Sequence, residues 1–276
     1  MLSVAGDLSS RLVPDGLWVL VEPLLPRFTP RKQSGGTAPV DERQAFAAVV
    51  YVLTSGCAWR MLPDTFGVSP ATAHRRFTAW TKAAGVWRRL HRAVLDELGA
   101  RGEIDWTSAI VDAANVRAKK GARLTGPNPV DRGKKGSKLH VLSDARGLPL
   151  AVGVSGANVH DTHALRPLVR GIPSIRSRRG PRRHRPGKLR VEKAYHSAEH
   201  RRWLRSRCIA SRVARPGIES GERLGRHRWR IERTISWLFG YRRLTVRYER
   251  KGEHFLAFLG LAAALTSYKR LAAITT

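Results

Sequence analysis

The feature that most constrains this chain is an arginine-rich segment, residues 227–244, that carries one acidic residue. Its apolar residues recur at helical spacing, which predicts a helix with one buried face. They are Ile231, Ile235, Trp237, Leu238 and Tyr241. The opposite face is almost entirely arginine, and Glu232 stands among these arginines. A carboxylate in such surroundings is either an ion-pair partner or a ligand for a divalent cation, which prefers oxygen ligands.

The charge of the whole chain points to a polyanionic partner. The 276 residues include 51 Lys and Arg against 21 Asp and Glu, a formal net charge of +30. This charge repels itself unless a polyanion neutralises it, and nucleic acid is the default partner. A membrane surface is the weaker alternative, because lipid binding usually uses a local basic patch. Hydrophobic residues make up 42% of the chain, so we expect a folded core and not a disordered basic tail.

The sequence favours a reduced, cytoplasmic protein. Its two cysteines, Cys57 and Cys208, lie in unrelated surroundings and suggest neither a disulfide framework nor a zinc site. Residues 1–11 lack the pattern of a signal peptide. The apolar stretch 255–265 is too short to span a bilayer and predicts a buried C-terminal helix.

Residues 1–100 are predicted to form a helical domain. Asp41 is placed to cap one helix, and Ser69 followed by Pro70 is placed to begin another. The second helix starts with small and polar residues, and Arg75 and Arg76 follow one turn later. This pattern is typical of a helix-turn-helix whose recognition helix enters the major groove. An ordinary helical hairpin with a solvated basic face is the alternative.

Residues 101–276 are predicted to form an α/β domain. Strands are expected at 109–112, 137–144, 148–154 and 189–191, with helices after Asp161 and from Ser197 to Arg207. This order predicts a mixed sheet with helices around it. Two basic segments, 117–138 and 176–185, lack apolar periodicity, so we expect loops that contact phosphate or are flexibly solvated.

Two carboxylates, Asp112 and Glu232, suggest the chemistry. Asp112 ends the first expected strand, and Glu232 lies on the basic helix. Cleavage of a phosphodiester can use two divalent ions held by carboxylates that face one cleft. The alternatives are a turn residue for Asp112 and an ion pair with Arg228 for Glu232. The scattered histidines are better explained as solvated or core residues than as a zinc site.

Several stretches together carry a resemblance to a known family. They are residues 110–113 (IVDA), 126–129 (GPNP) with 132–134 (RGK), 143–150 (SDARGLPL), 158–161 (NVHD), 193–195 (KAY), 219–229 (ESGERLGRHRW) and 231–234 (IERT) with 242–244 (RRL). They resemble bacterial insertion-sequence transposases of the branch named after insertion sequence five. These have an acidic-triad (DDE), ribonuclease-H-like core. The resemblance covers nearly the whole chain.

The resemblance implies catalytic, metal-binding carboxylates at Asp112, Glu192 and Glu232, with Arg228 one turn before the last. The sequence departs from the family pattern at the second carboxylate, where an aspartate is usual, and at a further acidic position, which holds His196. The lysine or arginine expected seven residues after Glu232 is also absent, because Phe239 stands there. Arg242 or Arg243 is a possible substitute. Asp161 is interpreted mainly as a helix N-cap, with metal binding as the alternative.

The implied activity is strand cleavage and strand transfer of an insertion sequence with Mg²⁺ or Mn²⁺. The implied partners are the terminal inverted repeats, bound by residues 1–100, and target DNA, with a homodimer on DNA and a nucleoid location in a bacterial cytoplasm. The residues expected to contact DNA are Arg75, Arg76, Lys134, Lys135, Lys138, Arg242 and Arg243. The rival hypothesis is a decayed transposase that only binds DNA or represses, because the extra methylene of Glu192 displaces its carboxylate by roughly 1.5 Å.

Overall fold

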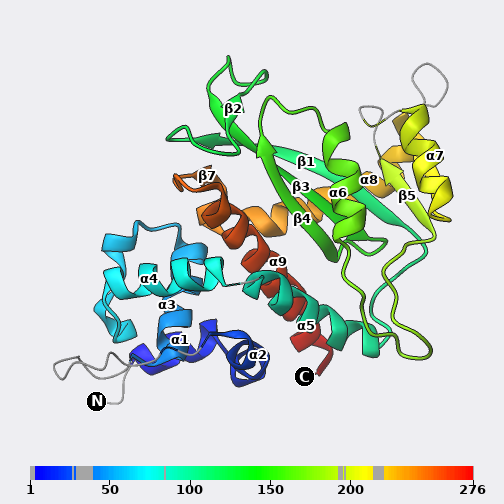
Figure 1. Cartoon of the computed structure of the whole chain (residues 1–276). Helices are drawn as coiled ribbons and strands as arrows, with labels where there is room; N and C mark the ends of the chain where they lie inside the picture. Colours follow the sequence, from blue (N-terminus) through cyan, green and yellow to red (C-terminus); the bar gives the residue numbers. More distant parts are fainter. Residues whose placement is uncertain are drawn as a thin grey trace.

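The computed structural model describes residues 4–26, 28, 40–83, 85–191, 195, 197–213 and 221–275. A sheet of seven strands lies at one end of the molecule, and the N-terminal helices lie at the other (Figure 1). The strands are β1 (Ala109–Ala118), β2 (Gly126–Pro127), β3 (Lys135–Asp144), β4 (Pro149–Gly156), β5 (Lys188–Val191), β6 (Ala210–Val213) and β7 (Val246–Arg247). The α-helices are α1 (Val4–Leu12), α2 (Asp15–Val21), α3 (Glu42–Ser55), α4 (Pro70–Lys82), α5 (Val86–Ala100), α6 (Thr162–Gly171), α7 (Ala198–Ser206), α8 (Gly221–Phe239) and α9 (Gly252–Thr275).

The sheet is mixed. Strands β1, β3 and β4 form an antiparallel meander, with Asp112 opposite Val141. Strand β5 then pairs parallel to β1, and β6 pairs parallel to β5. The order β4-β3-β1-β5-β6, with helices packed on it, is the arrangement of a ribonuclease-H-like core. The expected fold class is therefore confirmed.

Two of the N-terminal helices begin where the sequence predicts. The Asp41 side chain accepts hydrogen bonds from the backbone N–H groups of Arg43 and Gln44 at the start of α3. Gly56 ends α3 in the left-handed conformation, at φ 73°. Ser69 caps α4 by accepting from the N–H of Thr72. These caps satisfy backbone donors that the first helical turn leaves without partners.

The C-terminal helix α9 joins the two halves of the molecule. It packs against β4 and also against α4 and α5. Phe258 of α9 stacks on Phe77 of α4 with 4.4 Å between ring centroids. By length and composition alone α9 is apolar enough to cross a membrane, but 67% of that stretch is buried inside the protein. It is thus a core helix, as expected, although longer than the sequence suggested. The division at residue 100 stays a prediction.

Several strands differ from expectation. Strand β1 does not end at Asp112 but continues to Ala118, and β3 already begins at Lys135. Both ends of the expected basic loop 117–138 are therefore strand, paired as Arg117 opposite Gly136. Strands β2, β6 and β7 were not predicted. They have two to four residues each, too short to show alternation.

The Glu232 helix begins and ends earlier than expected. It ends at Phe239, and Arg242–Leu244 form a separate 3₁₀ turn. Ile231, Leu238 and Tyr241 are buried as predicted, but Trp237 is 44% exposed. The guanidinium of Arg233 lies 4.7 Å from the centroid of the Trp237 ring. The indole ring of Trp237 therefore makes a cation–π contact with Arg233 and does not pack into the core.

A buried ion pair ties this turn to the N-terminal helices. Arg243 Nε donates to Glu249 Oε1 at 2.7 Å, and the two side chains are 7% and 4% exposed. Arg243 Nη1 also donates to the carbonyl of Cys57, at 2.7 Å, just beyond the end of α3. Arg243 therefore connects α3 with the segment that leads into α9.

We predict that Glu249→Ala lowers the free energy of unfolding by about 3–5 kcal/mol, because it leaves the buried Arg243 charge without its partner. Glu253→Ala is the control, since it removes a glutamate whose ion pair with Arg123 is exposed. It should cost less than about 1 kcal/mol. Urea denaturation followed by circular dichroism measures both. Equal losses in the two variants would contradict the structural role of the Arg243–Glu249 pair.

Candidate active site

Asp112 lies in the first half of the central strand β1. It is half-buried, and its Oδ1 accepts a hydrogen bond from the N–H of Ala113 at 2.8 Å. The residues before it, Ala109, Ile110 and Val111, are buried in the core. Strand β3 pairs with Asp112 itself, and β5 pairs with Ala109 and Ile110 just before it, so the strand that carries Asp112 is held in the sheet.

Helix α8, which carries Glu232, is clamped onto the turn between β3 and β4. Arg230 Nη1 donates to the carbonyl of Ala145 at 2.8 Å, and Arg233 Nη2 donates to that of Arg146 at 2.7 Å. The buried hydroxyl of Thr234 donates to the carbonyl of Gly147. Three consecutive carbonyls of the turn thus receive donors from one helix. Since α8 also contacts β1, the elements that carry Asp112 and Glu232 pack together.

Gly147 permits this close approach. Its φ of 91° lies in the left-handed region that favours glycine. A Cβ at this position would meet the carbonyl oxygen of Arg230 and the hydroxyl of Thr234, each at 3.0 Å. The glycine therefore both makes the turn and leaves room for α8.

Asp144 shapes the same turn from inside. Its side chain is fully buried and accepts from three backbone N–H groups, those of Asp105, Arg146 and Leu148. Burial raises the pKa of Asp144 to about 6, against the opposing effect of these hydrogen bonds. Residues 143–150, one of the stretches that carry the family resemblance, therefore form the turn on which α8 packs. The Asp144 carboxylate stabilises this turn.

Glu232 lies on the solvent side of α8, and its side chain is 55% exposed. Arg228 Nε donates to its Oε1 at 2.7 Å, one helical turn away. The ion pair weighed as an alternative is therefore present. It does not exclude ligand binding, since an exposed pair of this kind contributes little to stability and leaves the carboxylate accessible.

Strand pairing places the described part of β5 beside the start of β1. Ile110 lies opposite Arg190 in the parallel β1–β5 pair, and β5 ends at Val191. The next residue in the sequence is Glu192, which lies outside the described residues, as does His196. The role of Glu192 stays a prediction.

Asp161 holds the N-cap position of α6, as interpreted from the sequence, but its side chain makes no capping hydrogen bond. Its Oδ1 instead forms an ion pair with Lys138 Nζ at 2.8 Å. Lys138 is 12% exposed and also donates to the carbonyl of Val159 at 2.9 Å. Both side chains therefore hold the loop before α6 against β3. Because the Lys138 amine is largely buried and already has two partners, it is poorly placed to contact DNA.

The other residues expected to contact DNA fall into two groups. Arg75, Lys134, Lys135 and Arg242 are exposed. Arg76 forms an ion pair with Glu42 at 2.9 Å, is 13% exposed, and its guanidinium lies 3.3 Å from the ring centroid of Phe28. Arg243 is buried, as described above, and its interior position does not fit a DNA contact or a replacement for the missing basic residue after Glu232.

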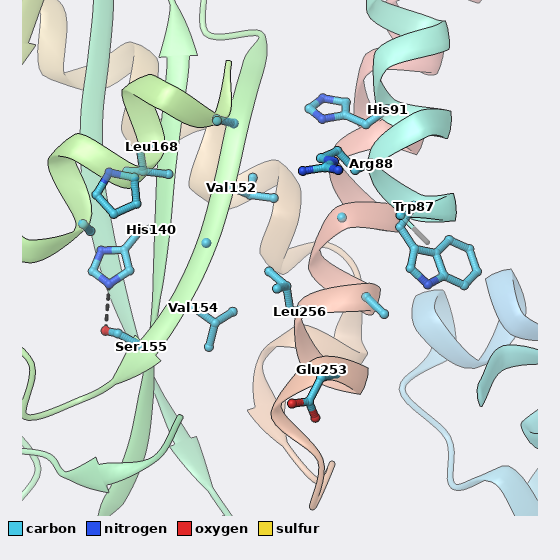
Figure 2. A pocket seen from close by; sticks show the side chains of 18 of the residues that line it. Trp87, Arg88, His91, His140, Val152, Val154, Ser155, Leu168, Glu253 and Leu256 are labelled. Atoms are coloured by element: carbon cyan, nitrogen blue, oxygen red, sulfur yellow. Dashed lines mark hydrogen bonds between the residues drawn. The ribbon is translucent and has the colours of Figure 1, made fainter. Parts of the chain in front are cut away.

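A cavity of about 580 Å³ lies elsewhere, between β4, α6, α5 and α9. Figure 2 shows Val152 and Val154 of β4 on one side and Leu256 of α9 on the other. His140 lies in its wall, where its Nε2 is 2.8 Å from the hydroxyl of Ser155. Burial lowers the pKa of His140 to about 4, so this histidine is neutral at pH 7. Neither Asp112 nor Glu232 lines this cavity.

The donor set of the candidate site suits hard cations. Carboxylate oxygens are the ligands that Mg²⁺ and Mn²⁺ prefer. Within the described ranges no three His, Cys, Asp or Glu side chains gather into a metal-binding group. Asp112 lies on β1 and Glu232 lies on α8, and these two elements pack against each other. This arrangement on a ribonuclease-H-like sheet defines a class of enzymes that transfer phosphoryl groups of nucleic acids.

Comparison with known proteins identifies the family. Residues 107–267 match the family described as a transposase DDE domain, and residues 13–91 match that of a putative transposase of the IS4/5 family. The chain belongs to the DDE transposases of insertion sequences, which are polynucleotidyl transferases and depend on divalent metal ions. The family expected from the sequence is therefore confirmed.

Two relatives come from Burkholderia cepacia. A putative transposase for insertion sequence element IS402 is 44% identical over 151 residues, which are 55% of this chain and 72% of the relative. An uncharacterized 16.2 kDa protein of the same element is 41% identical over 120 residues, 43% of this chain and 81% of the relative. Among solved structures, a piggyBac transposase synaptic complex with hairpin DNA aligns with 98% of this chain and 76% of its own, at 8% identity and a TM-score of 0.47. The family assignment rests on the sequence matches.

The environments of Arg75 and Arg76 predict different effects on DNA binding. Arg75→Ala should weaken binding to the terminal repeat by about 1–3 kcal/mol for a base contact, or lower the salt slope by about 1 for a phosphate contact. Arg76→Ala should mainly lower thermal stability, because Arg76 pairs with Glu42 inside the N-terminal part. Fluorescence anisotropy with repeat DNA measures the affinity. Unchanged affinity in Arg75→Ala would remove α4 from the DNA interface.

Proposed function

We propose that this transposase cleaves one strand at each end of an insertion sequence and joins the freed 3′-OH to target DNA. The packing of α8 on β1 carries the proposal, because it joins the strand of Asp112 to the helix of Glu232. The N-terminal helices would bind the terminal inverted repeats through α4. Two ends must be joined in one complex, so at least a homodimer on DNA is proposed. A nucleoid location in the bacterial cytoplasm follows from this role.

Asp112 and Glu232 would hold Mg²⁺, or Mn²⁺ in vitro, together with Glu192. When bound, the ions activate the attacking oxygen and stabilise the leaving one. The protein itself positions the carboxylates that would hold these ions. Strand β1 orients Asp112, and the clamp on the turn 145–147 sets the position of Glu232. Arg228 holds the Glu232 carboxylate at 2.7 Å, which restricts its rotamers until a cation competes for the same oxygen.

Substitution of either described carboxylate should separate binding from cleavage. Asp112→Asn and Glu232→Gln should keep the affinity for repeat DNA and lose divalent-dependent cleavage, because each removes a charged ligand. Glu253→Gln is a matched control, since Glu253 is also an exposed glutamate paired with an arginine. Denaturing gels of end-labelled repeat DNA measure the cleaved strand. Cleavage retained in either site variant would overturn the assignment.

The extra methylene at position 192 predicts a gain of activity. Glu192→Asp should raise the cleavage rate by about 10- to 100-fold, because a displacement of about 1 Å costs about 10²-fold in rate. Asp at position 196 as well should add to this if that position orients the loop. A wild-type rate that Glu192→Asp leaves unchanged would show that glutamate is accommodated.

Loss of cleavage in every form, with repeat binding intact, would instead favour the decayed, DNA-binding protein. Unimpaired cleavage in Glu192→Ala would make another residue the second ligand. Asp161 is then the next candidate to test.

A further inference from the structure

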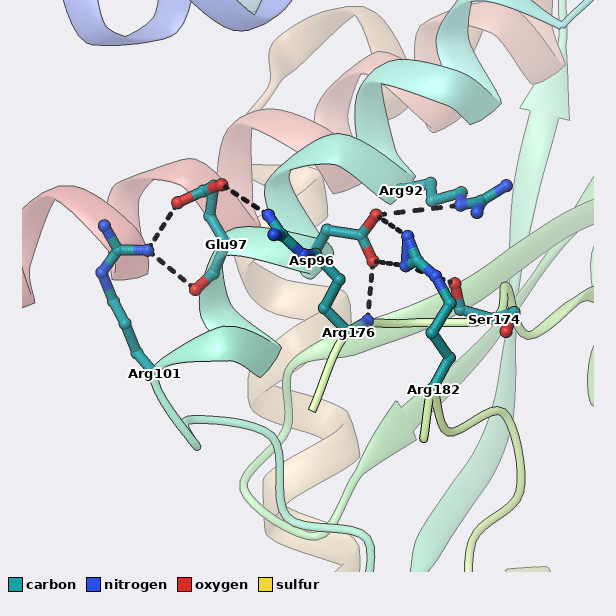
Figure 3. Close-up of polar contacts among 7 residues, drawn as sticks. All are labelled: Arg92, Asp96, Glu97, Arg101, Ser174, Arg176 and Arg182. Carbon is teal, nitrogen blue, oxygen red and sulfur yellow. Dashed lines mark hydrogen bonds and ion pairs between the residues drawn. The ribbon is translucent and has the colours of Figure 1, made fainter. Parts of the chain in front are cut away.

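The segment between α6 and β5 is docked on α5. Of the two alternatives that its composition suggested, phosphate contact or flexible solvation, the flexible loop is wrong. Arg182 forms a two-pronged ion pair with Asp96 of α5, with both nitrogen–oxygen distances at 2.8 Å. The backbone N–H of Arg176 donates to the same carboxylate at 2.8 Å (Figure 3). Ile175 and Arg183 exchange two backbone hydrogen bonds of 2.8 Å, which close the segment into a narrow hairpin.

Helix α5 is shaped to receive this segment. A Cβ at Gly99, in its last turn, would meet the carbonyl oxygen of Arg176 at 2.1 Å and the side chain of Ile175 at 2.8 Å. A glycine inside a helix costs roughly 0.5–1 kcal/mol relative to alanine. Here the absence of a side chain lets the backbone of the segment lie directly against the helix. Ile175 is fully buried by this contact.

The docked segment presents a row of cations to solvent. Arg178, Arg179, Arg183 and Arg185 are all exposed, and none of them forms an ion pair within the described ranges. Arg183 lies over the ring of Trp106, at 5.5 Å from its centroid. Arg185 Nη1 donates to the carbonyl of Arg207 at 3.2 Å, so the segment also contacts the end of α7.

The stretch of sequence that carries these arginines is almost entirely basic. Residues 162–213 contain sixteen Lys and Arg against two Asp and Glu. One of these acids, Glu199, is paired with Arg166 at 2.7 Å. Exposed arginines can bind the phosphates of a duplex, and a segment whose backbone is already docked loses little conformational entropy on binding.

The position of the row separates it from the candidate active site. The segment leads into the start of β5 at Lys188, whereas Glu192 follows the end of that strand. Four strand residues span about 13 Å at roughly 3.3 Å per residue. The row is also distinct from α4, the helix expected to read the terminal repeat.

We infer that the segment 176–185, docked on α5 and continued by the end of α7, binds the phosphate backbone of a second DNA duplex without regard to sequence. The duplex in question is DNA other than the element's own ends. The inference rests on the proposed function, because it assigns a place to target DNA. Asp96 and Gly99 act as positioning residues for the row.

The decisive variant is Arg178→Glu/Arg179→Glu. Anisotropy is measured with a labelled duplex of random sequence over a series of salt concentrations. The affinity should fall at least about tenfold, and the salt slope should fall by about 2, one unit for each phosphate contact. The control Arg88→Glu/Arg89→Glu makes the same charge change at exposed positions of α5. It should leave the slope within about half a unit of the wild type. Equal effects of the two pairs would overturn the inference.

Gly99→Ala tests the docking without any change of charge. The methyl group must displace the segment, so random-duplex affinity should fall while repeat cleavage persists. Wild-type affinity in a folded Gly99→Ala protein, shown by circular dichroism, would overturn the positioning role. If this variant does not fold, the arginine pair still decides the proposal.

A competition experiment identifies the duplex. With saturating unlabelled repeat DNA present, the labelled random duplex should still bind to the wild type. Complete displacement would show that the row contacts the element's own ends and would overturn the inference. Absence of repeat cleavage by the wild type would count against the proposed function only, because random-duplex binding is measured without any reaction.

Discussion

The clamp between α8 and the β3–β4 turn is the interaction on which the candidate site depends. Glu232 stands between Arg230 and Thr234, whose side chains donate to the carbonyls of Ala145 and Gly147. A rotation of α8 that moved Glu232 would break these bonds and leave polar groups without partners next to the core. The position of Glu232 is thus set by a turn some 85 residues earlier in the chain. Glycine suits position 147, because the φ of this residue is 91° and a Cβ would lie only 3.0 Å from the carbonyl oxygen of Arg230 and the hydroxyl of Thr234.

Local signals in the sequence predicted local structure well. The caps at Asp41 and Ser69 were read from single residues, because a cap needs only a side chain and the next helical turn. Apolar periodicity was less reliable. It placed Trp237 in the core, although Arg233 holds that ring at the surface. It also missed β6, an edge strand whose Ala210 and Arg212 face solvent, so no alternation of apolar residues marks it.

The carboxylates of the candidate site were predictable, whereas the uses of the basic residues were not. Acidic residues are few in a chain of net charge +30, so a carboxylate at the end of an apolar run, such as Asp112, is a clear candidate for a functional residue. An arginine in the same chain carries no such signal, because its role depends on the oxygen that the fold brings to it. Arg243 finds Glu249, and the fully buried Arg247 donates to the carbonyls of Arg123, Leu124 and Glu249. Arg247 reaches the carbonyl of Arg123, 124 residues away, and Arg243 reaches that of Cys57, 186 residues away, so such partners become visible only in the tertiary structure.

Fold and chemistry are therefore separable in this protein. Two of the stretches that carry the resemblance to insertion-sequence transposases, 143–150 and 231–234, contain Asp144, Gly147 and Thr234, and these residues build the support for α8. The hydrogen bonds that hold α8 on this turn join residues 145–147 to residues 230–234 and do not involve position 192. A copy of the element with a poor second carboxylate would keep the sheet, the clamp and the basic surfaces, and with them its capacity to bind DNA. Stability and DNA affinity consequently cannot report on catalytic competence, because the interactions that give the chain its shape are not those that the reaction requires.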